Sequence, residues 1–292
     1  MGKYSTRDII VNITSKKGSI TLKNLHFEAE VVKTLSATPN VCNLTVYNLS
    51  KKSRDFLTSI YDNEVSTFTI EIILDNNQMF KGDIVNVTTI YNQGTWTTHI
   101  YGNEGYNAYR ASASVQTKKG DTRETILGSL TDTLKEFGLN AVDIQALKNG
   151  CGNKSILKSI LYTQNVIENI KKLIKDCLPN ADITIDGDKM KILDKHQTTG
   201  NTIEFTKFLE PPQLNEQGCR IVIQLNSKPK IGDAMTLVAK SYNQAFGNLT
   251  TNRARKSAFS GEGTYKIIEI SHSFDNFNSD VAKTNITGVF LR

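Results

Sequence analysis

The chain has 292 residues, a formal net charge of +6, 38% hydrophobic residues and 22% charged residues. A chain of this length is longer than one hydrophobic core usually organises, and the apolar fraction is sufficient for the packed cores of two or three domains. No apolar run approaches the roughly 20 residues that span a bilayer, and the N-terminus lacks the basic and then apolar build of a signal peptide, so we expect no membrane insertion by this chain.

Residues 1–102 carry the alternation of apolar and polar residues that is typical of half-buried strands. The alternation begins at Ile9, returns across Phe68–Leu74 and is divided by turn residues such as Asp75-Asn76-Asn77. We expect Gly82 to open the strand that follows this turn. The whole pattern predicts a small antiparallel barrel or sandwich over residues 1–102.

The segment from Leu25 to Ser50 is the most specific part of this region. It contains an extended strand, a Thr38-Pro39-Asn40 turn and a second strand that alternates from Cys42 to Val46. The hydroxyl of Ser50 can then accept a backbone N–H that the first turn of a helix leaves unpaired. We therefore expect a short helix over Lys51–Ser59.

Residues 103–199 change to the apolar spacing of helices. Asp121 and Glu124 form a capping box ahead of an apolar stripe that ends at Gly138. A second helix is predicted from Asn165 to Cys177, and the Asp186-Gly187 turn after it predicts a hairpin. We expect these residues to form a small α/β domain.

Residues 200–292 return to the alternation of strands, first through Cys219–Leu225 and again through Ile268–Phe274. The predicted fold class is therefore mainly β with an α/β insert, in which two antiparallel β-barrel domains are separated by a small α/β domain. The stretch from Lys240 to Gly263 has no such period. A loop of this length is usually functional or disordered, and we expect it to order against a partner.

The histidines and cysteines do not form a reactive or metal-binding motif. The four cysteines form no CxxC motif, which favours free thiols in a reducing compartment. The histidines lack the spacing of metal ligands, and those at positions 99 and 272 lie within strand patterns, which favours structural hydrogen-bonding roles. These residues are Cys42, Cys151, Cys177, Cys219, His26, His99, His196 and His272.

The carboxylates do not form a recognisable site either. Glu28 and Glu30 share one face of a strand, which favours a solvent or interface face over acid–base chemistry. Asp186 and Asp188 flank Gly187, but the other ligands of a calcium loop are missing. We therefore expect no enzyme activity, no catalytic residues, no metal site and no cofactor.

The basic residues occur in small groups, and acidic residues lie among most of these groups. No group is interleaved with aromatic residues as a nucleic-acid stacking platform would be. This distribution favours solvated faces and interface rims over a site that reads DNA sequence. The groups are Lys16-Lys17, Lys51-Lys52-Arg54, Lys118-Lys119-Arg123, Lys171-Lys172-Lys175 and Arg253-Arg255-Lys256.

A family resemblance runs through nearly the whole chain, and its residues are Phe27, Glu30, Thr38-Pro39-Asn40, Leu44–Ser50, Gly82, Gly102, Gly105, Gly120-Asp121-Thr122, Pro211-Pro212 to Gly232-Asp233, and Tyr265-Lys266-Ile267 to His272. In this order the segments resemble the baseplate hub proteins of contractile-tailed bacteriophages, the late-control-protein-D type. That family is related to the hub part of type VI secretion spike proteins. Only the block from Phe27 to Ser50 is specific by itself.

The resemblance implies a homotrimer in the virion tail baseplate, assembled in the cytoplasm of the bacterial host. Two tail-tube-like β-barrels per chain would give a pseudo-sixfold ring that adapts the hexameric tail-tube ring to the trimeric central spike protein. Surrounding baseplate proteins would be further partners. DNA would pass through the lumen without specific binding, so we expect a lining without dense Lys and Arg. The implied domains are residues 1–102, 103–199 and 200–292.

Three other readings compete with the hub of a phage tail. The chain could be the hub of a phage-derived contractile injection particle or of a type VI-like secretion spike. A glycan-binding β-protein would use Trp96, Tyr101, Tyr106 and Tyr109 as a stacking platform, whereas an aromatic core and domain hinge explain the same residues. A hydrolase is the third reading, and the sequence offers no active site for it.

Overall fold

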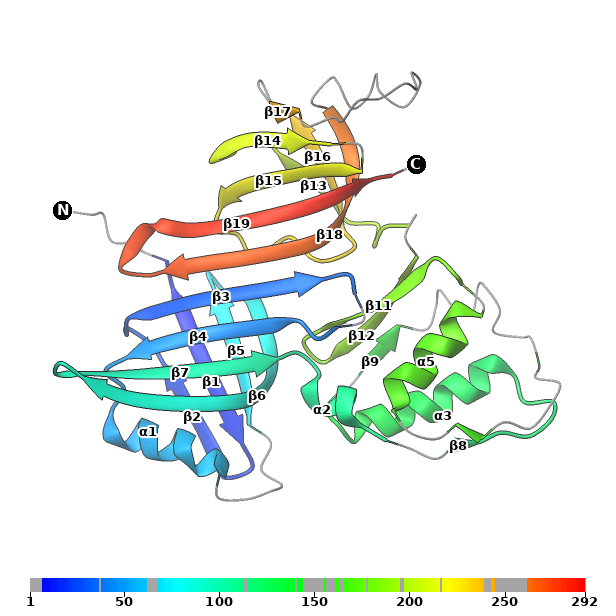
Figure 1. Ribbon diagram of the computed structural model, residues 1–292, viewed down its shortest axis with the longest axis horizontal. Helices are drawn as coiled ribbons and strands as arrows, with labels where there is room; N and C mark the ends of the chain where they lie inside the picture. The colour runs from blue at the N-terminus through cyan, green and yellow to red at the C-terminus, as the bar shows by residue number, and fades with distance from the viewer. Residues whose placement is uncertain are drawn as a thin grey trace.

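The structure is a computed structural model that describes most of the chain. The described residues are 7–36, 38–61, 68–112, 115–139, 141–143, 155, 161–162, 165–176, 178–194, 197–215, 217–238, 243–244 and 262–291. Figure 1 shows two β-units stacked on one another and an α/β unit beside them.

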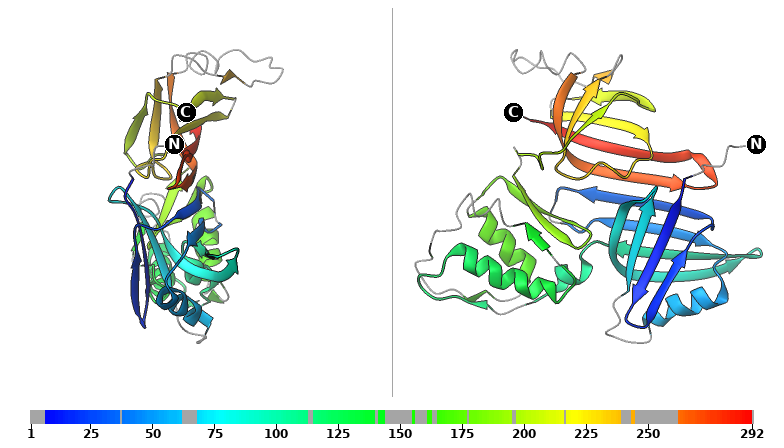
Figure 2. Two further views of the ribbon diagram at one scale, coloured as in Figure 1. Left: turned by 90° about the vertical axis from the view of Figure 1, so that its left-hand side faces the viewer. Right: turned by 180° about the vertical axis from the view of Figure 1, so that it is seen from behind.

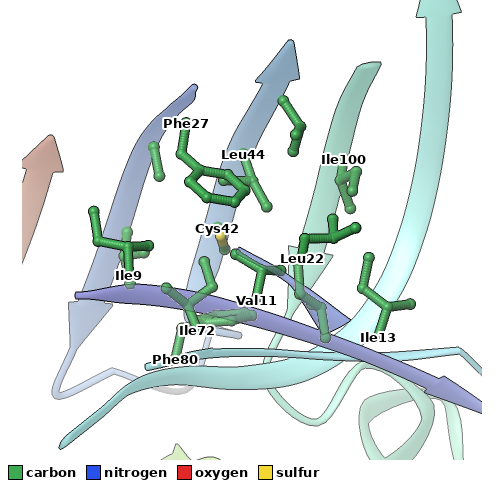
Figure 3. Packing of buried hydrophobic residues seen from close by; sticks show 14 of the residues in the cluster. Ile9, Val11, Ile13, Leu22, Phe27, Cys42, Leu44, Ile72, Phe80 and Ile100 are labelled. Carbon is green, nitrogen blue, oxygen red and sulfur yellow. The ribbon is translucent and has the colours of Figure 1, made fainter. Parts of the chain in front are cut away.

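The N-terminal β-unit follows the alternation of its sequence, because buried residues alternate with more exposed ones along its strands. Figure 3 shows Phe27, Cys42 and Leu44 facing Val11 and Ile72 across the resulting core. Its elements are β1 (Ile9–Ser15), β2 (Gly18–Leu22), β3 (Phe27–Thr34), β4 (Val41–Tyr47), α1 (Lys51–Thr58), the 3-10 helix η1 (Ser59–Tyr61), β5 (Thr69–Leu74), β6 (Asn77–Asn92) and β7 (Thr95–Asn103).

Two expectations for this unit have definite outcomes. The short helix is confirmed as α1, and the Ser50 hydroxyl accepts the backbone N–H of Ser53 at 3.1 Å. The expectation that Gly82 opens a strand is wrong, because β6 begins at Asn77 and runs through it. A Cβ atom at Gly82 would lie 2.6 Å from the carbonyl oxygen of Asn103, so glycine permits the close approach of two strands.

The α/β unit packs two helices against a small sheet with a core of its own. Its β11–β12 hairpin is antiparallel, with Gly187 in the turn at φ 65°, and β9 pairs with β12 in parallel. Its elements are α2 (Tyr106–Arg110), β8 (Val115–Gln116), α3 (Arg123–Lys135), β9 (Ala141–Asp143), β10 (Leu161–Tyr162), α5 (Val166–Lys175), β11 (Ala181–Asp186) and β12 (Lys189–Asp194).

The predicted helix starts of this unit are correct in one case and shifted in the other. Asn165 caps α5 and accepts the backbone N–H of Glu168 at 3.0 Å. The cap of α3 is Thr122, which accepts from Thr125 at 3.2 Å, so the prediction of Asp121 is wrong. The Asp121 carboxylate accepts the backbone N–H of Lys118 at 2.7 Å instead.

The C-terminal β-unit encloses a third core. The segment from Lys240 to Gly263 lies mostly outside the described residues, apart from the strand β17 and the start of β18. The elements are β13 (Thr202–Phe205), β14 (Glu210–Leu214), β15 (Gly218–Gln224), β16 (Ala234–Val238), β17 (Asn243–Gln244), β18 (Glu262–Asp275) and β19 (Asn278–Phe290). The predicted fold class, mainly β with an α/β insert, is confirmed.

A single sheet of 14 strands runs through both β-units within the described residues. Its main path is β17-β14-β15-β19-β18-β3-β4-β7-β6-β5-β1-β2. The units therefore meet where β18 of one pairs with β3 of the other, and Figure 2 shows these strands side by side from behind.

The strand order of the first β-unit is repeated in the second. The order β3-β4-β7-β6-β5-β1 has its counterpart in β14-β15-β19-β18-β16-β13. The registers also agree, because Cys42 lies opposite Gly102 in the first unit and Cys219 lies opposite Gly288 in the second. The last pairing differs, since β1 and β5 are antiparallel whereas β13 and β16 are parallel.

A β-bulge marks the same place in both units. The pairing of β6 with β7 shifts between Ile84 and Asn86, and that of β18 with β19 shifts between Ile267 and Glu269. Bulges re-aim a strand at a defined point, so a shared bulge is a strong sign of equivalent architecture. With this alignment, the strand segment from Asn86 to Asn92 in β6 is equivalent to Glu269–Asp275 in β18.

No helix among the described residues has both the length and the apolar character needed to cross a membrane.

Candidate assembly surfaces and unit junctions

The β18–β3 junction, which we call the internal seam, is a continuous antiparallel ladder. It extends from the pair Glu269 and Thr34 to the pair Asp275 and Glu28. Phe274 lies on β18 but belongs to the core of the N-terminal unit, where only 2% of its surface is exposed. The seam thus combines main-chain pairing with an aromatic side chain donated across it.

The tip of the β18–β19 hairpin docks on Leu25–Phe27, where β3 begins. Asn276 makes three contacts there, because its side chain accepts the N–H of Phe27 at 2.8 Å and donates to the carbonyl of Leu25 at 2.7 Å. Its own N–H donates to the carbonyl of Phe27 at 3.1 Å. The ring of Phe277 lies 4.5 Å from that of His26. This tip therefore fixes the end of the internal seam.

His26, Glu28 and Asp275 meet at this end of the internal seam. His26 Nε2 lies 2.9 Å from Asp275 and 3.6 Å from Glu28, and the His26 ring stacks on Tyr47 at 4.3 Å. Burial, followed by the hydrogen bond to Glu28, raises the pKa of Tyr47. One imidazole and two carboxylates whose ligand atoms lie within 4.8 Å of one another could hold a divalent cation. The hydrogen bonds already present satisfy the same atoms, and the expected absence of a metal site stays an expectation.

A buried ion-pair network joins the N-terminal β-unit to the α/β unit. Lys33 on β3 lies 2.9 Å from Glu104, which follows β7, and 2.8 Å from Asp186 at the end of β11. The side-chain amide of Asn40 donates to Glu104 at 2.7 Å and to the carbonyl of Ile185 at 2.6 Å. Since buried charges require such complete partnership, the two units are held in one orientation.

The network determines the ionisation of its members. Burial alone would lower the pKa of Lys33, but Glu104 and Asp186 outweigh it, and the pKa is raised. The pKa of Asp186 is lowered because Lys33 and the other nearby lysines outweigh the effect of its burial. Burial raises the pKa of Glu104 in spite of Lys33. Lys33 and Asp186 are therefore charged at neutral pH.

The C-terminal β-unit reaches the same region through Lys230. Its ammonium donates to the carbonyl of Gln78 at 3.1 Å, and burial lowers its pKa although Asp186 acts in the opposite direction. All three units therefore place charged groups around one junction. The buried Cys42 thiol is close enough to interact electrostatically with Glu104 and Lys33, and burial raises its pKa.

Several stretches of the large sheet pair on one edge only in the described part of the chain, and two of them also carry exposed apolar side chains. The second half of β6 pairs only with β7, and near its end Ile90 and Tyr91 are 49% and 58% exposed. The other stretch is the start of β14, preceded by Leu209 at 50% exposed. A cavity of about 400 Å³ adjoins Leu209 and is lined by Glu204–Leu209, Ile223, Gln224 and Asn226.

The residues singled out in the sequence are dispersed over the structure. His272 is buried and hydrogen-bonds Thr284 at 3.0 Å, whereas exposed His99 lies 3.1 Å from Thr45. Cys42 and Cys219 are free and buried, as expected. The residues His196, Cys151 and Cys177 lie outside the described residues.

The four aromatic residues of the glycan reading do not form one platform. Trp96 packs against Tyr91 near the end of the β6–β7 hairpin, with the Arg54 guanidinium 3.9 Å from its ring centre. Tyr101 lies five residues further along β7, which at about 3.4 Å per residue is roughly 17 Å away. Tyr106 and Tyr109 lie on α2. The structure thus gives no support to a common stacking surface.

The buried network was missed by the sequence analysis, although a signal for it was present. Lys33 occupies the inward position of a strand whose other inward residues are Phe27, Ala29 and Val31. A charged residue at an inward position of a strand requires a buried partner of opposite charge. The inward position of Lys33 in the alternation of β3 therefore indicated a buried ion pair. Glu104, in contrast, follows β7, and Asp186 is the last residue of β11, and exposure is common at both kinds of position.

Neither a protein-family model nor a curated protein matches the chain. Solved structures do match it over nearly its full length. The 43 kDa tail protein of prophage MuSo2 from Shewanella oneidensis has a TM-score of 0.61 at 9% identity, with 98% of this chain and 97% of that chain covered. The tail protein of Neisseria meningitidis MC58 has a TM-score of 0.57 at 7% identity, with 96% of each chain covered.

An Escherichia coli component of the type VI secretion system is also similar, with a TM-score of 0.54 at 10% identity over 95% of this chain and 76% of that chain. That protein is described as structurally similar to the bacteriophage T4 tail proteins gp27 and gp5. The present chain therefore has the fold shared by phage tail proteins and this secretion component. The resemblance identified in the sequence is confirmed at the level of the fold.

Proposed function

We propose that this chain is a structural virion protein, the baseplate hub of a contractile tail. Three copies form a ring of six β-units that adapts the hexameric tail-tube ring to the trimeric central spike and forms part of the DNA-ejection channel. The observation that carries this proposal is the duplication of one β-unit within a single continuous sheet. Two similar units per chain convert threefold symmetry into an approximate sixfold ring.

The three units, residues 1–102, 103–199 and 200–292, have different roles in this proposal. The two β-units build the ring, and the α/β unit, fixed by the Lys33 network, breaks its sixfold symmetry. Surrounding baseplate proteins bind the outside, while DNA passes through the lumen without specific binding. The chain acts through surfaces and has no enzymatic role in this proposal.

A second function, the hub of a type VI-like secretion spike or phage-derived injection particle, is favoured by the likeness to the secretion component. The two functions share the ring and differ in the partners above and below it. Co-purification with a tail-tube or a secretion-tube protein from the same genome distinguishes them.

Native mass spectrometry of the purified chain tests the ring. We expect a species of three times the 32.5 kDa mass of the chain, either alone or after addition of the spike protein. The chain should dissociate to monomers in denaturant. A stable monomer under both native conditions, at micromolar concentration, would contradict the proposal.

A further inference from the structure

We propose that the tip of the β6–β7 hairpin of one copy docks on the segment Lys207–Glu210 of a second copy of this chain. In this contact Tyr91 enters the cavity beside Leu209, and Asn92 lies opposite Glu210. This inference rests on the proposed ring and names the surfaces that close it. It concerns the tip alone, since the edge of each strand beyond the tip is already occupied.

The internal seam is the template for this contact. In the equivalent alignment of the two β-units, the hairpin β6–β7 corresponds to β18–β19, and β14 corresponds to β3. The β18–β19 tip has its receiving segment, residues 25–28, within the same chain. Among the described residues, no segment of the same chain lies against the β6–β7 tip in this way. Likewise, no hairpin tip of the same described residues lies against the start of β14.

The equivalent registers define which residues meet. Gln213 and Leu214 lie opposite Arg220 and Cys219, as Glu30 and Val31 lie opposite Asn43 and Cys42. Glu210 then corresponds to Glu28, with the irregularity at Pro211 and Pro212 taking up one extra residue. Because Asp275 lies opposite Glu28 in the internal seam, its counterpart Asn92 lies opposite Glu210 in the proposed contact.

The side chains at the tip agree with this register. Phe274 leaves its own unit and is buried in the core of the neighbouring one. Its counterpart is Tyr91, which is 58% exposed within the single chain. The cavity of about 400 Å³ lies beside the core of the C-terminal unit, and its lining includes the apolar residues Phe205, Phe208, Leu209 and Ile223. An exposed aromatic side chain on one copy can therefore contact the apolar part of a mixed polar and apolar cavity on the second copy.

Neighbouring elements limit the contact to the tip on both surfaces. The hydroxyl of Tyr61 accepts the N–H of Val87 at 3.0 Å and lies 2.7 Å from its carbonyl oxygen, which occupies the β6 edge there. On β14, the short strand β17 pairs with Gln213 and Leu214. The prolines at positions 211 and 212 offer no N–H donor. Among the described residues, no strand pairs with the outer edge of residues 88–92 on one copy or of residues 207–210 on the other.

The two free surfaces lie toward opposite ends of the sheet path, with β14 near one end and β6 beyond the internal seam (Figure 1). A contact between two different surfaces of identical chains is heterologous, so each copy can bind one neighbour on each side. Such contacts generate rings when the rotation closes. Three copies with one internal seam and one intermolecular contact each give six junctions in the ring.

Disulfide cross-linking of the full chain tests the register. The double variant Asn92→Cys with Glu210→Cys should form covalent dimers and trimers on mild oxidation, because directly opposed residues have the Cα separation of a disulfide. The matched control Thr88→Cys with Glu210→Cys is displaced by four positions along the same strand and should give severalfold less product. The parent chain and each single variant measure the background from the native cysteines.

The variant Tyr91→Asp provides an independent measurement. It should convert the trimer to monomers with an unchanged circular dichroism spectrum, whereas Val238→Asp, at a residue 49% exposed on β16, should remain trimeric. A trimer that resists Tyr91→Asp and does not cross-link at positions 92 and 210 overturns this contact but leaves the proposed hub intact. A parent chain that stays monomeric with the spike protein overturns both.

Discussion

Cys42 and Cys219 show how the duplicated units are built at the scale of single residues. Both thiols are buried, burial raises the pKa of each, and each lies opposite a glycine. A Cβ atom at Gly102 would lie 3.2 Å from Ile70, and one at Gly288 would overlap the Met235 side chain. The missing Cβ atoms let core side chains cross these strands, and the two thiols pack in the cores beside them.

A third equivalent pair predicts the pH dependence of stability. The side chains of His272 and Thr284 form a hydrogen bond at the position where Thr89 and Thr98 form one in the first β-unit. Burial, together with the positive charges of Lys33 and Lys230, lowers the pKa of His272 from 6.5 to about 3. The unfolded chain therefore binds a proton below pH 6.5 that the folded chain does not. The stability contributed by neutral His272 is present above that pH and lost as the pH falls toward 3.

We expect His272→Thr to make the chain less dependent on pH. Between about pH 7.5 and about pH 4.5 the parent should lose roughly 2–3 kcal/mol of unfolding free energy through this group. The variant should lack that loss, although its smaller side chain lowers stability at neutral pH. Urea unfolding at the two pH values measures both chains. Equal losses in the parent and the variant would show that His272 does not titrate as its environment requires.

At the scale of elements, the internal seam makes the stability of the two β-units interdependent. Truncation of Phe274 to alanine should lower the free energy of unfolding by about 3–5 kcal/mol, because it removes a buried aromatic side chain from the neighbouring core. The control Phe277→Ala, at a residue 56% exposed on the same hairpin tip, should cost less than about 1 kcal/mol. Hydrogen exchange should increase in β3 as well as β18 for the first variant. Faster exchange confined to β18 would argue against coupling across the seam.

The elements could be predicted from sequence where local chemistry determines them. Alternation identified the strands of both β-units, and Ser50 and Asn165 identified two helix starts. Asp121 failed as a cap because two suitable side chains are adjacent, and the Asp121 carboxylate stabilises the preceding turn while Thr122 caps α3. The prediction that Gly82 opens a strand failed because alternation does not reveal that a strand passes close to another backbone.

The junctions between units could not be derived in the same way. β3 and β18 are far apart in the chain, and nothing in their alternation specifies that each is the partner of the other. The cavity beside Leu209 likewise depends on how the connection between β13 and β14 folds over the end of β15. Family resemblance supplied the duplicated architecture, whereas the registers that identify the free tip required the structure.

At the scale of the whole molecule, the distribution of charge agrees with the proposal that the ring passes DNA without holding it. The net charge of +6 is modest for 292 residues. Several lysines of the described surface are neutralised locally, as Lys135 is by Asp132 at 2.6 Å and Lys81 is by Asp188 at 3.4 Å. Tight DNA binding requires many unpaired cations aligned with phosphates, and each of these adds to the salt dependence of affinity. A channel lining rich in such cations would slow the passage of DNA.

We therefore expect the assembled chain to bind duplex DNA weakly and with a shallow dependence on salt. Fluorescence anisotropy with a labelled duplex, measured between about 50 and 200 mM salt, should show no saturable binding at the upper end of this range. A basic DNA-binding protein of similar size serves as the positive control. Saturable binding whose affinity falls steeply as the salt concentration rises would indicate a dense row of lysines and arginines on an accessible surface. The proposed lumen would then retain DNA.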